Sequence, residues 1–316
     1  MTKLFKTITF LGSDKNAGKT TAFLYYLNHC DDISKLILTS IGINGESIDE
    51  YEKHSKPQIF LAKNQKFITK HQRLLNSQGQ FKILNIFNQP KFKDTFVLAQ
   101  TLIDSHYILE GPNDKKDILL IKNYLQSYYP NHHLLIDGSI DRQFLCDPKV
   151  SNEVYYSLLI SERKVQRDKA KQFLLLHNFK KCNWSHKLFQ SDYKTIFFDK
   201  EKSIIYKSKL NANFDTEMIH HIKKTSFLFL NCALSHNLLK QIKNIKLTII
   251  LENPSLLVSN LSNELIQNYN IQLLNKAYIK KVFIKEDKQG FLNEFSILNH
   301  YSFHNLFQEE HHAIRL

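Results

Sequence analysis

The sequence contains little of what interrupts regular structure or cross-links a chain: 8 glycines, 6 prolines and 4 cysteines among 316 residues. The cysteines are far apart in the sequence and form no CxxC pair, which predicts neither a disulfide framework nor a zinc site. No stretch approaches the roughly 18 apolar residues that a membrane-spanning helix needs. A glycine loop follows the first short apolar segment, where a signal peptide would need a cleavage site of small residues. We therefore expect a cytoplasmic protein that does not act at a membrane.

The composition is that of a folded protein with an excess of positive charge. Hydrophobic residues make up 42% of the chain and charged residues 23%, enough to bury the core of one large domain or two smaller ones. The formal net charge of +13 would suit a nucleic-acid-binding protein. However, the basic residues are scattered, with no dense run and no zinc-finger or RNP-type motif. The charge therefore indicates a compositional bias, and nucleic acid is not an expected partner.

Short apolar runs alternate with helical patterns along most of the chain, which predicts an α/β fold with a largely parallel sheet. The strands and helices expected in the first half are Thr7–Leu11, Thr20–Asn28, Leu36–Ile41, Tyr107–Leu109, a helix from Asn113 or Asp114 to about Tyr128, Leu134–Ile136 and Arg163–His177. A small β-rich insertion is expected between about residues 57 and 96. The basic, polar stretch 180–194 is expected to divide the chain into residues 1–190 and a C-terminal α/β part of residues 191–316.

The segment Gly12–Thr21 follows an apolar strand and opens an amphipathic helix, which is the context that a phosphate-binding loop needs. Gly12 is expected to let the chain turn sharply off the strand, so that backbone N–H groups and the helix dipole surround phosphate oxygens. Lys19 is expected to reach the β- and γ-phosphates, and the Thr20 hydroxyl to ligate Mg²⁺. Five residues, one more than usual, separate Gly12 from Gly18, because Ser13 stands where the first glycine of the usual motif would be. The predicted nucleotide-binding residues are Gly12, Ser13, Asn16, Ala17, Gly18, Lys19, Thr20 and Thr21.

This loop extends the α/β prediction to a P-loop NTPase fold: a mainly parallel sheet flanked by helices, with residues 1–190 as the nucleotide-binding domain. The expected ligands are ATP and Mg²⁺. ATP is favoured over GTP because the Asn-Lys-x-Asp motif of guanine recognition is missing. The nearest stretch, Asn275-Lys276-Ala277-Tyr278, lacks the aspartate.

A phosphate-binding loop of this kind works with an acidic residue at the end of a neighbouring strand, which helps to hold Mg²⁺. Asp137 ends an apolar strand and precedes a glycine, and we predict it as the second magnesium residue beside Thr20. Glu110, at another strand end, is the rival candidate. Asp141 and Arg142 follow on the next loop and, with Lys19, are the predicted catalytic residues, although a local salt bridge is the alternative for that pair. The segment Thr39–Glu46 is either a loop that moves with the phosphates or an ordinary glycine-rich connection.

Four segments, in order, resemble the nucleotide-binding subunit of the lysine 5,6-aminomutase reactivase. They are the loop itself, Leu38–Glu46 with Asn44 in place of an aspartate, Gly111-Pro112, and Leu135–Arg142. The resemblance covers about residues 5–165 and is thin beyond them. It implies an ATP-driven reactivating chaperone that acts with a second ATPase subunit. The pair would release damaged cobalamin from a client adenosylcobalamin-dependent aminomutase.

The loop spacing also looks like that of dethiobiotin synthetase, a small-molecule ligase in which ATP phosphorylates a carbamate. In that interpretation Glu110 would be the acidic strand end. The chain is longer than such an enzyme needs, and Asp137 with Asp141 and Arg142 fits the reactivase pattern better. A GTPase chaperone of a metal or cobalamin enzyme is a third interpretation, which the missing guanine motif disfavours.

Overall fold

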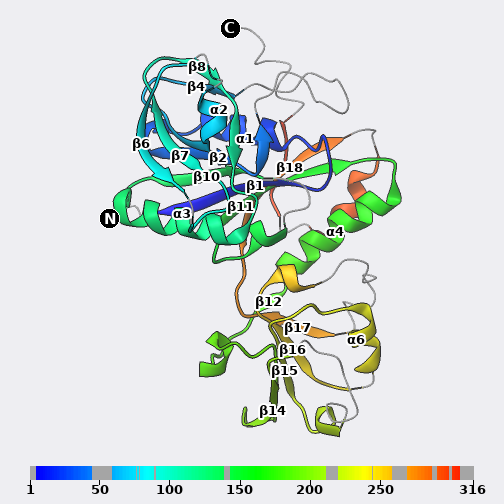
Figure 1. The fold of residues 1–316 in the computed structure, drawn as a ribbon. Coiled ribbons are helices and arrows are strands. Elements are labelled where there is room, and N and C mark those ends of the chain that lie inside the picture. Colours follow the sequence, from blue (N-terminus) through cyan, green and yellow to red (C-terminus); the bar gives the residue numbers. More distant parts are fainter. Residues whose placement is uncertain are drawn as a thin grey trace. The chain divides into compact units, whose positions relative to one another are not determined.

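The computed structural model describes residues 5–44, 59–75, 77, 79–88, 90–138, 143–210, 220–243, 245–257, 269–286, 290–298 and 301–306 (Figure 1). The chain divides into two compact units. Unit 1 comprises residues 1–145, 149–167 and 278–316, and unit 2 comprises residues 146–148 and 168–277. Among the described residues, no helix has both the length and the apolar character required to cross a membrane.

Unit 1 is built on one large sheet. Its strands, in spatial order, are β19 (Phe303–Asn305), β18 (Tyr278–Glu286), β11 (Glu153–Ile160), β1 (Lys6–Gly12), β10 (His133–Asp137), β2 (Leu36–Ser40), β5 (Lys66–Lys70), β7 (Phe96–Thr101) and β6 (Phe81–Phe87). The strands from β19 to β5 run parallel, whereas β7 is antiparallel to both β5 and β6. The sheet is therefore mixed.

Short elements complete unit 1. Two antiparallel pairs lie outside the large sheet: β3 (Gly42–Asn44) with β9 (Leu109–Gly111), and β4 (Ile59–Leu61) with β8 (Ser105–Tyr107). The helices are α1 (Lys19–Asn28), α2 (His71–Leu75), α3 (Lys115–Tyr128) and the first turn of α4 (Lys164–Asn178), with 3-10 turns at Ile33–Lys35, Gln143–Cys146 and Leu292–Leu298. The Asp114 side chain caps α3 by accepting a hydrogen bond from the Asp117 amide, as expected from the sequence.

Unit 2 has its own mixed sheet. Its strands, in spatial order, are β12 (Lys180–Lys181), β17 (Asn270–Leu273), β16 (Thr248–Leu251), β15 (Phe227–Leu230), β13 (Thr195–Phe198) and β14 (Ile204–Ser208). β13 is antiparallel to both of its neighbours, and the other pairs are parallel. The rest of α4, the helix α6 (His236–Gln241) and 3-10 turns at Lys187–Gln190 and Pro254–Leu256 belong to this unit.

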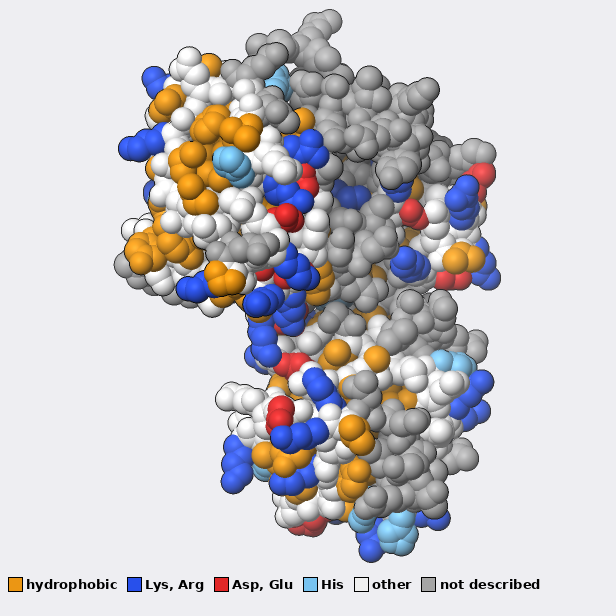
Figure 2. Space-filling model, viewed as in Figure 1, with side chains coloured by type: hydrophobic (Ala, Val, Ile, Leu, Met, Phe, Trp, Pro, Cys, Tyr) orange, Lys and Arg blue, Asp and Glu red, His pale blue; other side chains and the backbone are white. Residues whose placement is uncertain are grey.

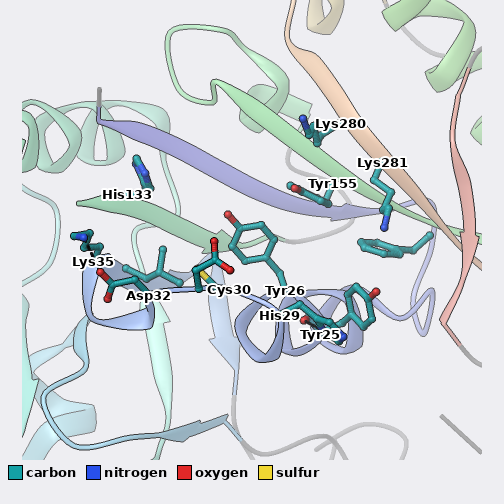
Figure 3. A pocket seen from close by; sticks show the side chains of 13 residues that line it. Tyr25, Tyr26, His29, Cys30, Asp32, Lys35, His133, Tyr155, Lys280 and Lys281 are labelled. Carbon is teal, nitrogen blue, oxygen red and sulfur yellow. Dashed lines mark hydrogen bonds and ion pairs between the residues drawn. The ribbon is translucent and has the colours of Figure 1, made fainter. Parts of the chain in front are cut away.

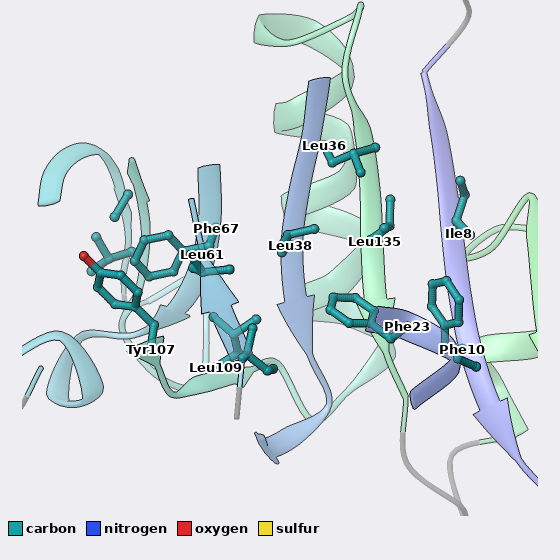
Figure 4. Packing of buried hydrophobic residues seen from close by; sticks show 14 of the residues in the cluster. Ile8, Phe10, Phe23, Leu36, Leu38, Leu61, Phe67, Tyr107, Leu109 and Leu135 are labelled. Carbon is teal, nitrogen blue, oxygen red and sulfur yellow. The ribbon is translucent and has the colours of Figure 1, made fainter. Parts of the chain in front are cut away.

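Packing in the core of unit 1 anchors the two elements that flank the Gly12–Thr21 loop, β1 and α1. Alternate residues of β1, Ile8 and Phe10, point to the same face of the sheet, where Phe23 of α1 packs against them (Figure 4). The Phe10 and Phe23 rings meet edge to face with their centroids 5.3 Å apart. β1 is buried on both faces after its first residue, as expected for a central strand of a parallel region. The segment between β1 and α1 therefore has both of its ends anchored in the core.

The α/β class is as predicted, but the P-loop NTPase fold with a mainly parallel sheet flanked by helices is wrong for this chain. Both large sheets are mixed, and strands contribute more of the described residues than helices do. The segment expected as a separate β-rich insertion supplies β5 and β6, which together with β7 extend the edge of the large sheet. Hydrophobic periodicity identifies a strand but does not tell which way it runs, and this is why the sequence did not predict the antiparallel edge.

The compact units also differ from the division at residue 190. Apart from the short stretch 146–148, the boundaries between them lie at 167/168 and 277/278, so that α4 has residues in both units. The reason is β18, which pairs with β11 from Tyr278 to Glu286 and so returns the end of the chain to the first sheet. A composition shift at 180–194 carries no information about a strand that pairs with a partner more than a hundred residues away.

Candidate phosphate-binding site

The loop after β1 is tied to the neighbouring strand β11 by two hydrogen bonds. The Ser13 amide donates to the Ser157 carbonyl at 2.9 Å, and the Ser13 hydroxyl accepts from the Leu159 amide at 2.8 Å. These bonds give a structural reason for the serine at position 13, where the usual motif has its first glycine. A glycine at position 13 could make the first bond but not the second, so the serine fixes the start of the loop against β11.

Two residues of the loop have left-handed backbone conformations, Asn16 with φ 61° and Gly18 with φ 84°. Asparagine and glycine are the residues that adopt this region most readily. Gly18 is also the N-cap residue of α1, and as a glycine it has no side chain to cap the first turn. The helix therefore begins with amide groups that the N-cap residue does not satisfy, a property of anion-binding helix ends.

Gly12 is required for a reason other than the sharp turn that the sequence suggested. It is the last residue of β1 and does not have a positive φ. A Cβ atom added there would lie 2.6 Å from Cγ of Lys19 and 3.3 Å from Cβ of Ala17. The Lys19 side chain thus passes directly over Gly12, and its Nζ donates to the Asp14 carbonyl at 3.3 Å. Any larger residue at position 12 would displace this lysine from the loop.

The two predicted magnesium residues lie together. The Thr20 hydroxyl, in the first turn of α1, donates to Oδ2 of Asp137 at 3.0 Å. Asp137 is the last residue of β10 and is fully buried. Its carbonyl accepts a hydrogen bond from the Ile41 amide, and the next amide, that of Gly138, donates to the Phe10 carbonyl, both at 2.8 Å. The carboxylate is therefore positioned by three adjacent strands.

The Thr20 hydroxyl and the Asp137 carboxylate could provide two oxygen ligands to a hard cation, whose coordination a bound substrate would complete. A hydroxyl and a carboxylate oxygen are donors that Mg²⁺ prefers, and Mg²⁺ is commonly held by one or two such groups with substrate phosphates and water. Within the described parts of the chain, no group of three or more His, Cys, Asp or Glu residues could hold a metal. A Mg²⁺ ion at Thr20 and Asp137 would take its other ligands from phosphate oxygens and water.

Glu110, the rival magnesium residue, is held by two basic side chains. Its carboxylate forms ion pairs with Lys70 at 2.8 Å and with Arg73 at 2.6 Å. Burial raises the pKa of Glu110, but the hydrogen bonds and charges of Lys70 and Arg73 outweigh it and leave the pKa below its ordinary value. An ionised carboxylate that already neutralises two cations is a poor metal ligand, so Asp137 is the better candidate.

The remaining predicted residues are only partly described. Asp141 and Arg142 lie outside the described residues, as do Gly45 and Glu46 at the end of the Thr39–Glu46 segment. The described start of that segment is regular: Gly42–Asn44 forms β3 and pairs with β9. Thr21, the last predicted loop residue, lies in the first turn of α1.

A polar hollow of about 490 Å³ opens beside the loop. Its lining comes from the loop, from the segment after β11, from the start of α4 and from β18: Asp14, Lys15, Asn16, Leu159, Ser161, Glu162, Arg163, Gln166 and Lys285. Only the loop residues of this set were singled out in the sequence. The others were missed because β11 and β18 lie far away along the chain and neither carries a motif.

A second hollow, of about 480 Å³, lies where β2 and β10 begin and α1 ends (Figure 3). Its polar groups contact one another: Lys35 pairs with Asp32 at 2.6 Å, and His29 stacks on Tyr25. Burial raises the pKa of Tyr26 to about 12, so this phenol stays protonated. Because these side chains already contact one another, we interpret this hollow as packing at the start of the strands and not as a ligand site.

Hydrophobic side chains gather at several places on the visible surface, one of them on unit 1. Figure 2 shows hydrophobic residues gathered over β4 and β6 of unit 1, where Phe60, Ile83 and Ile86 are 45–50% exposed. Basic side chains in the same view lie in small groups among acidic and neutral ones.

Comparisons with protein-family models, with curated proteins and with solved structures found no match to this chain. The resemblance to the reactivase subunit therefore remains a prediction from the sequence. What the chain binds has to be argued from the loop, the hollow and the residues around them.

Proposed function

We propose that this chain binds a nucleoside triphosphate, in preference ATP, with Mg²⁺ at the Gly12–Thr21 loop and hydrolyses it. The observation that carries the proposal is the 3.0 Å contact between the Thr20 hydroxyl and Asp137 at the start of α1. It brings a loop residue and a carboxylate together across 117 positions of sequence, beside a helix end suited to phosphate. A chance Gly-Lys-Thr sequence would not require such a partner.

Each residue of the site has a distinct role in this proposal. Backbone amides of the loop surround the β- and γ-phosphates, and the Lys19 ammonium neutralises part of their charge. Thr20 and Asp137 would hold Mg²⁺, which when bound neutralises charge on the phosphate oxygens. The bonds of Ser13 to β11 keep the loop in shape before the ligand arrives, so little reorganisation is needed on binding.

The test is binding and turnover of ATP by the wild-type chain and by Lys19→Ala. ATP with Mg²⁺ should raise the melting temperature of the wild-type protein, because a ligand bound only to the native state stabilises it. Lys19→Ala should lose most of that shift and any release of phosphate, while Lys116→Ala, an exposed lysine on α3, should behave as wild type. An equal shift in the Lys19→Ala protein would refute the proposal.

The sequence resemblance extends this proposal to a biological role. Hydrolysis would be coupled, with a second ATPase subunit, to the release of damaged cobalamin from an aminomutase, and turnover by this chain alone would be slow. An inactivated aminomutase should regain activity with this protein, its partner, adenosylcobalamin and ATP, and should not with Lys19→Ala. ATP consumption that depends on a diamino acid and bicarbonate would instead favour the ligase. The ion pairs of Glu110 with Lys70 and Arg73 speak against the ligase, which would need Glu110 at its metal.

A further inference from the structure

The polar hollow lies beside the first part of the loop proposed for the phosphates. Asp14, Lys15 and Asn16 line it from the loop side. Lys285, from β18 on the opposite side, donates its Nζ proton to the Asn16 carbonyl at 3.1 Å. A ligand whose phosphates lie on the loop therefore has a space of about 490 Å³ next to them for its remaining part.

The wall of this hollow after β11 is held rigidly by Arg167. This buried guanidinium donates to the Ser161 and Glu162 carbonyls, both at 2.7 Å. It also pairs with Glu294 at 3.0 Å and lies over the Phe291 ring at 3.9 Å. These contacts of one side chain fix the turn between β11 and α4, so the side chains of that turn are presented in a defined geometry.

Within the turn, the amide of Gln166 has one orientation that satisfies its neighbours. The Ser161 hydroxyl accepts from the Arg163 amide at 3.2 Å and donates to Oε1 of Gln166 at 2.6 Å. The amide oxygen is therefore occupied, and its NH₂ group is the part that remains for another partner. In the described parts of the chain Nε2 of Gln166 has no hydrogen-bond partner, and the residue is only partly buried.

We propose that the hollow receives the nucleoside of the bound nucleotide and that Gln166 donates a hydrogen bond to an acceptor atom of its base. This inference rests on the proposed function, because the phosphates place the rest of the ligand. Among the described residues that line the hollow none is aromatic, so no aromatic ring from this set stacks on the base. Every base carries a ring nitrogen or a carbonyl oxygen that accepts, so Gln166 adds affinity for the nucleoside without selecting one base strongly.

The test compares ATP with inorganic tripolyphosphate, which has the phosphates but no nucleoside. Calorimetric titrations in the presence of Mg²⁺ would use the wild type, Gln166→Glu, Gln166→Leu and the control Val165→Ala. Leucine removes both the donor and the acceptor that Ser161 uses, without adding charge. Glutamate keeps an acceptor for Ser161, removes the donor and adds a negative charge near the phosphates. Val165 is adjacent, 80% exposed and not among the described residues that line the hollow.

We expect ATP to bind wild type about tenfold more tightly than tripolyphosphate, and Gln166→Leu to lose about tenfold for ATP alone, the value of one hydrogen bond. Gln166→Glu should weaken ATP more than it weakens tripolyphosphate. Val165→Ala should match wild type. Equal affinity of wild type for the two ligands, or variants that weaken both ligands alike, would overturn the inference while leaving phosphate binding intact. Failure of wild type to bind either ligand would instead refute the proposed function.

Discussion

The two units begin comparable helices in opposite ways. In unit 1, α1 follows strand β1 and starts at Gly18, whose left-handed φ of 84° is combined with the absence of a side chain. In unit 2, α6 follows strand β15 and starts at Ser235, whose hydroxyl accepts a hydrogen bond from the Leu238 amide at 3.3 Å. Each helix follows a strand that pairs in parallel with a neighbour, β1 with β10 and β15 with β16. The strand–helix connection alone therefore does not make a binding site.

What differs is whether the protein satisfies the helix terminus by itself. The Ser235 side chain occupies one donor of α6, as capping residues commonly do. The start of α1 has no such residue, and instead places Lys19, Thr20 and Asp137 around its first turn. Amide groups at a helix start that no side chain caps are left to water or to a ligand. In the proposed function the phosphates complete the start of α1, whereas in unit 2 the protein itself caps the start of α6.

The largest effect should come from giving α1 the cap that α6 has. Gly18→Ser places a side chain at a positive φ, which costs about 1–2 kcal/mol, and puts its hydroxyl among the amides proposed for phosphate. We expect ATP affinity to fall beyond detection while circular dichroism still reports a folded chain. Retained ATP affinity in this variant would mean that the start of α1 is not the phosphate site.

A paired substitution separates the two acidic strand ends. Glu110→Gln leaves Lys70 and Arg73 without their carboxylate and should lower stability by about 1–3 kcal/mol, with Mg²⁺-dependent ATP binding unchanged. Asp137→Asn should instead remove the Mg²⁺-dependent part of ATP binding. Because the pKa of Glu110 is lowered, its contribution is present above the unfolded-state pKa and is lost as the pH falls through the folded-state value. Urea unfolding at several pH values and titrations with and without Mg²⁺ would measure both effects, and exchanged roles would contradict the account.

The smallest effect should come from removing the cap of α6. Ser235→Ala should cost about 1 kcal/mol of stability, as is typical for the loss of an N-cap. ATP affinity should not change, because no residue of unit 2 belongs to the proposed site. Chemical denaturation and the same ATP titration would check this, and a loss of ATP affinity would show that unit 2 takes part in binding.

The local parts of this site could be predicted from the sequence, and the long-range parts could not. The loop, α1, β10 and Asp137 are recognisable because each apolar strand is followed directly by its polar residues. β11 reads Glu-Val-Tyr-Tyr-Ser-Leu-Leu-Ile and was missed, since it carries no motif. Lys285 and Gln166 reach the hollow only through the pairing of β11 with β18 and of β1 with β11. The antiparallel run of β7 and β6 is likewise a matter of strand pairing, which a single sequence does not reveal.

The most direct test of the central claim is hydrogen–deuterium exchange of the wild-type chain and of Lys19→Ala, each with and without ATP and Mg²⁺. The account predicts that the nucleotide slows exchange of the wild-type amides over residues 12–22, the loop and the start of α1, and leaves residues 235–242 of unit 2 unchanged. Lys19→Ala should show no such slowing. Protection confined to unit 2, or equal protection of residues 12–22 in both proteins, would contradict the claim that this loop binds the phosphates.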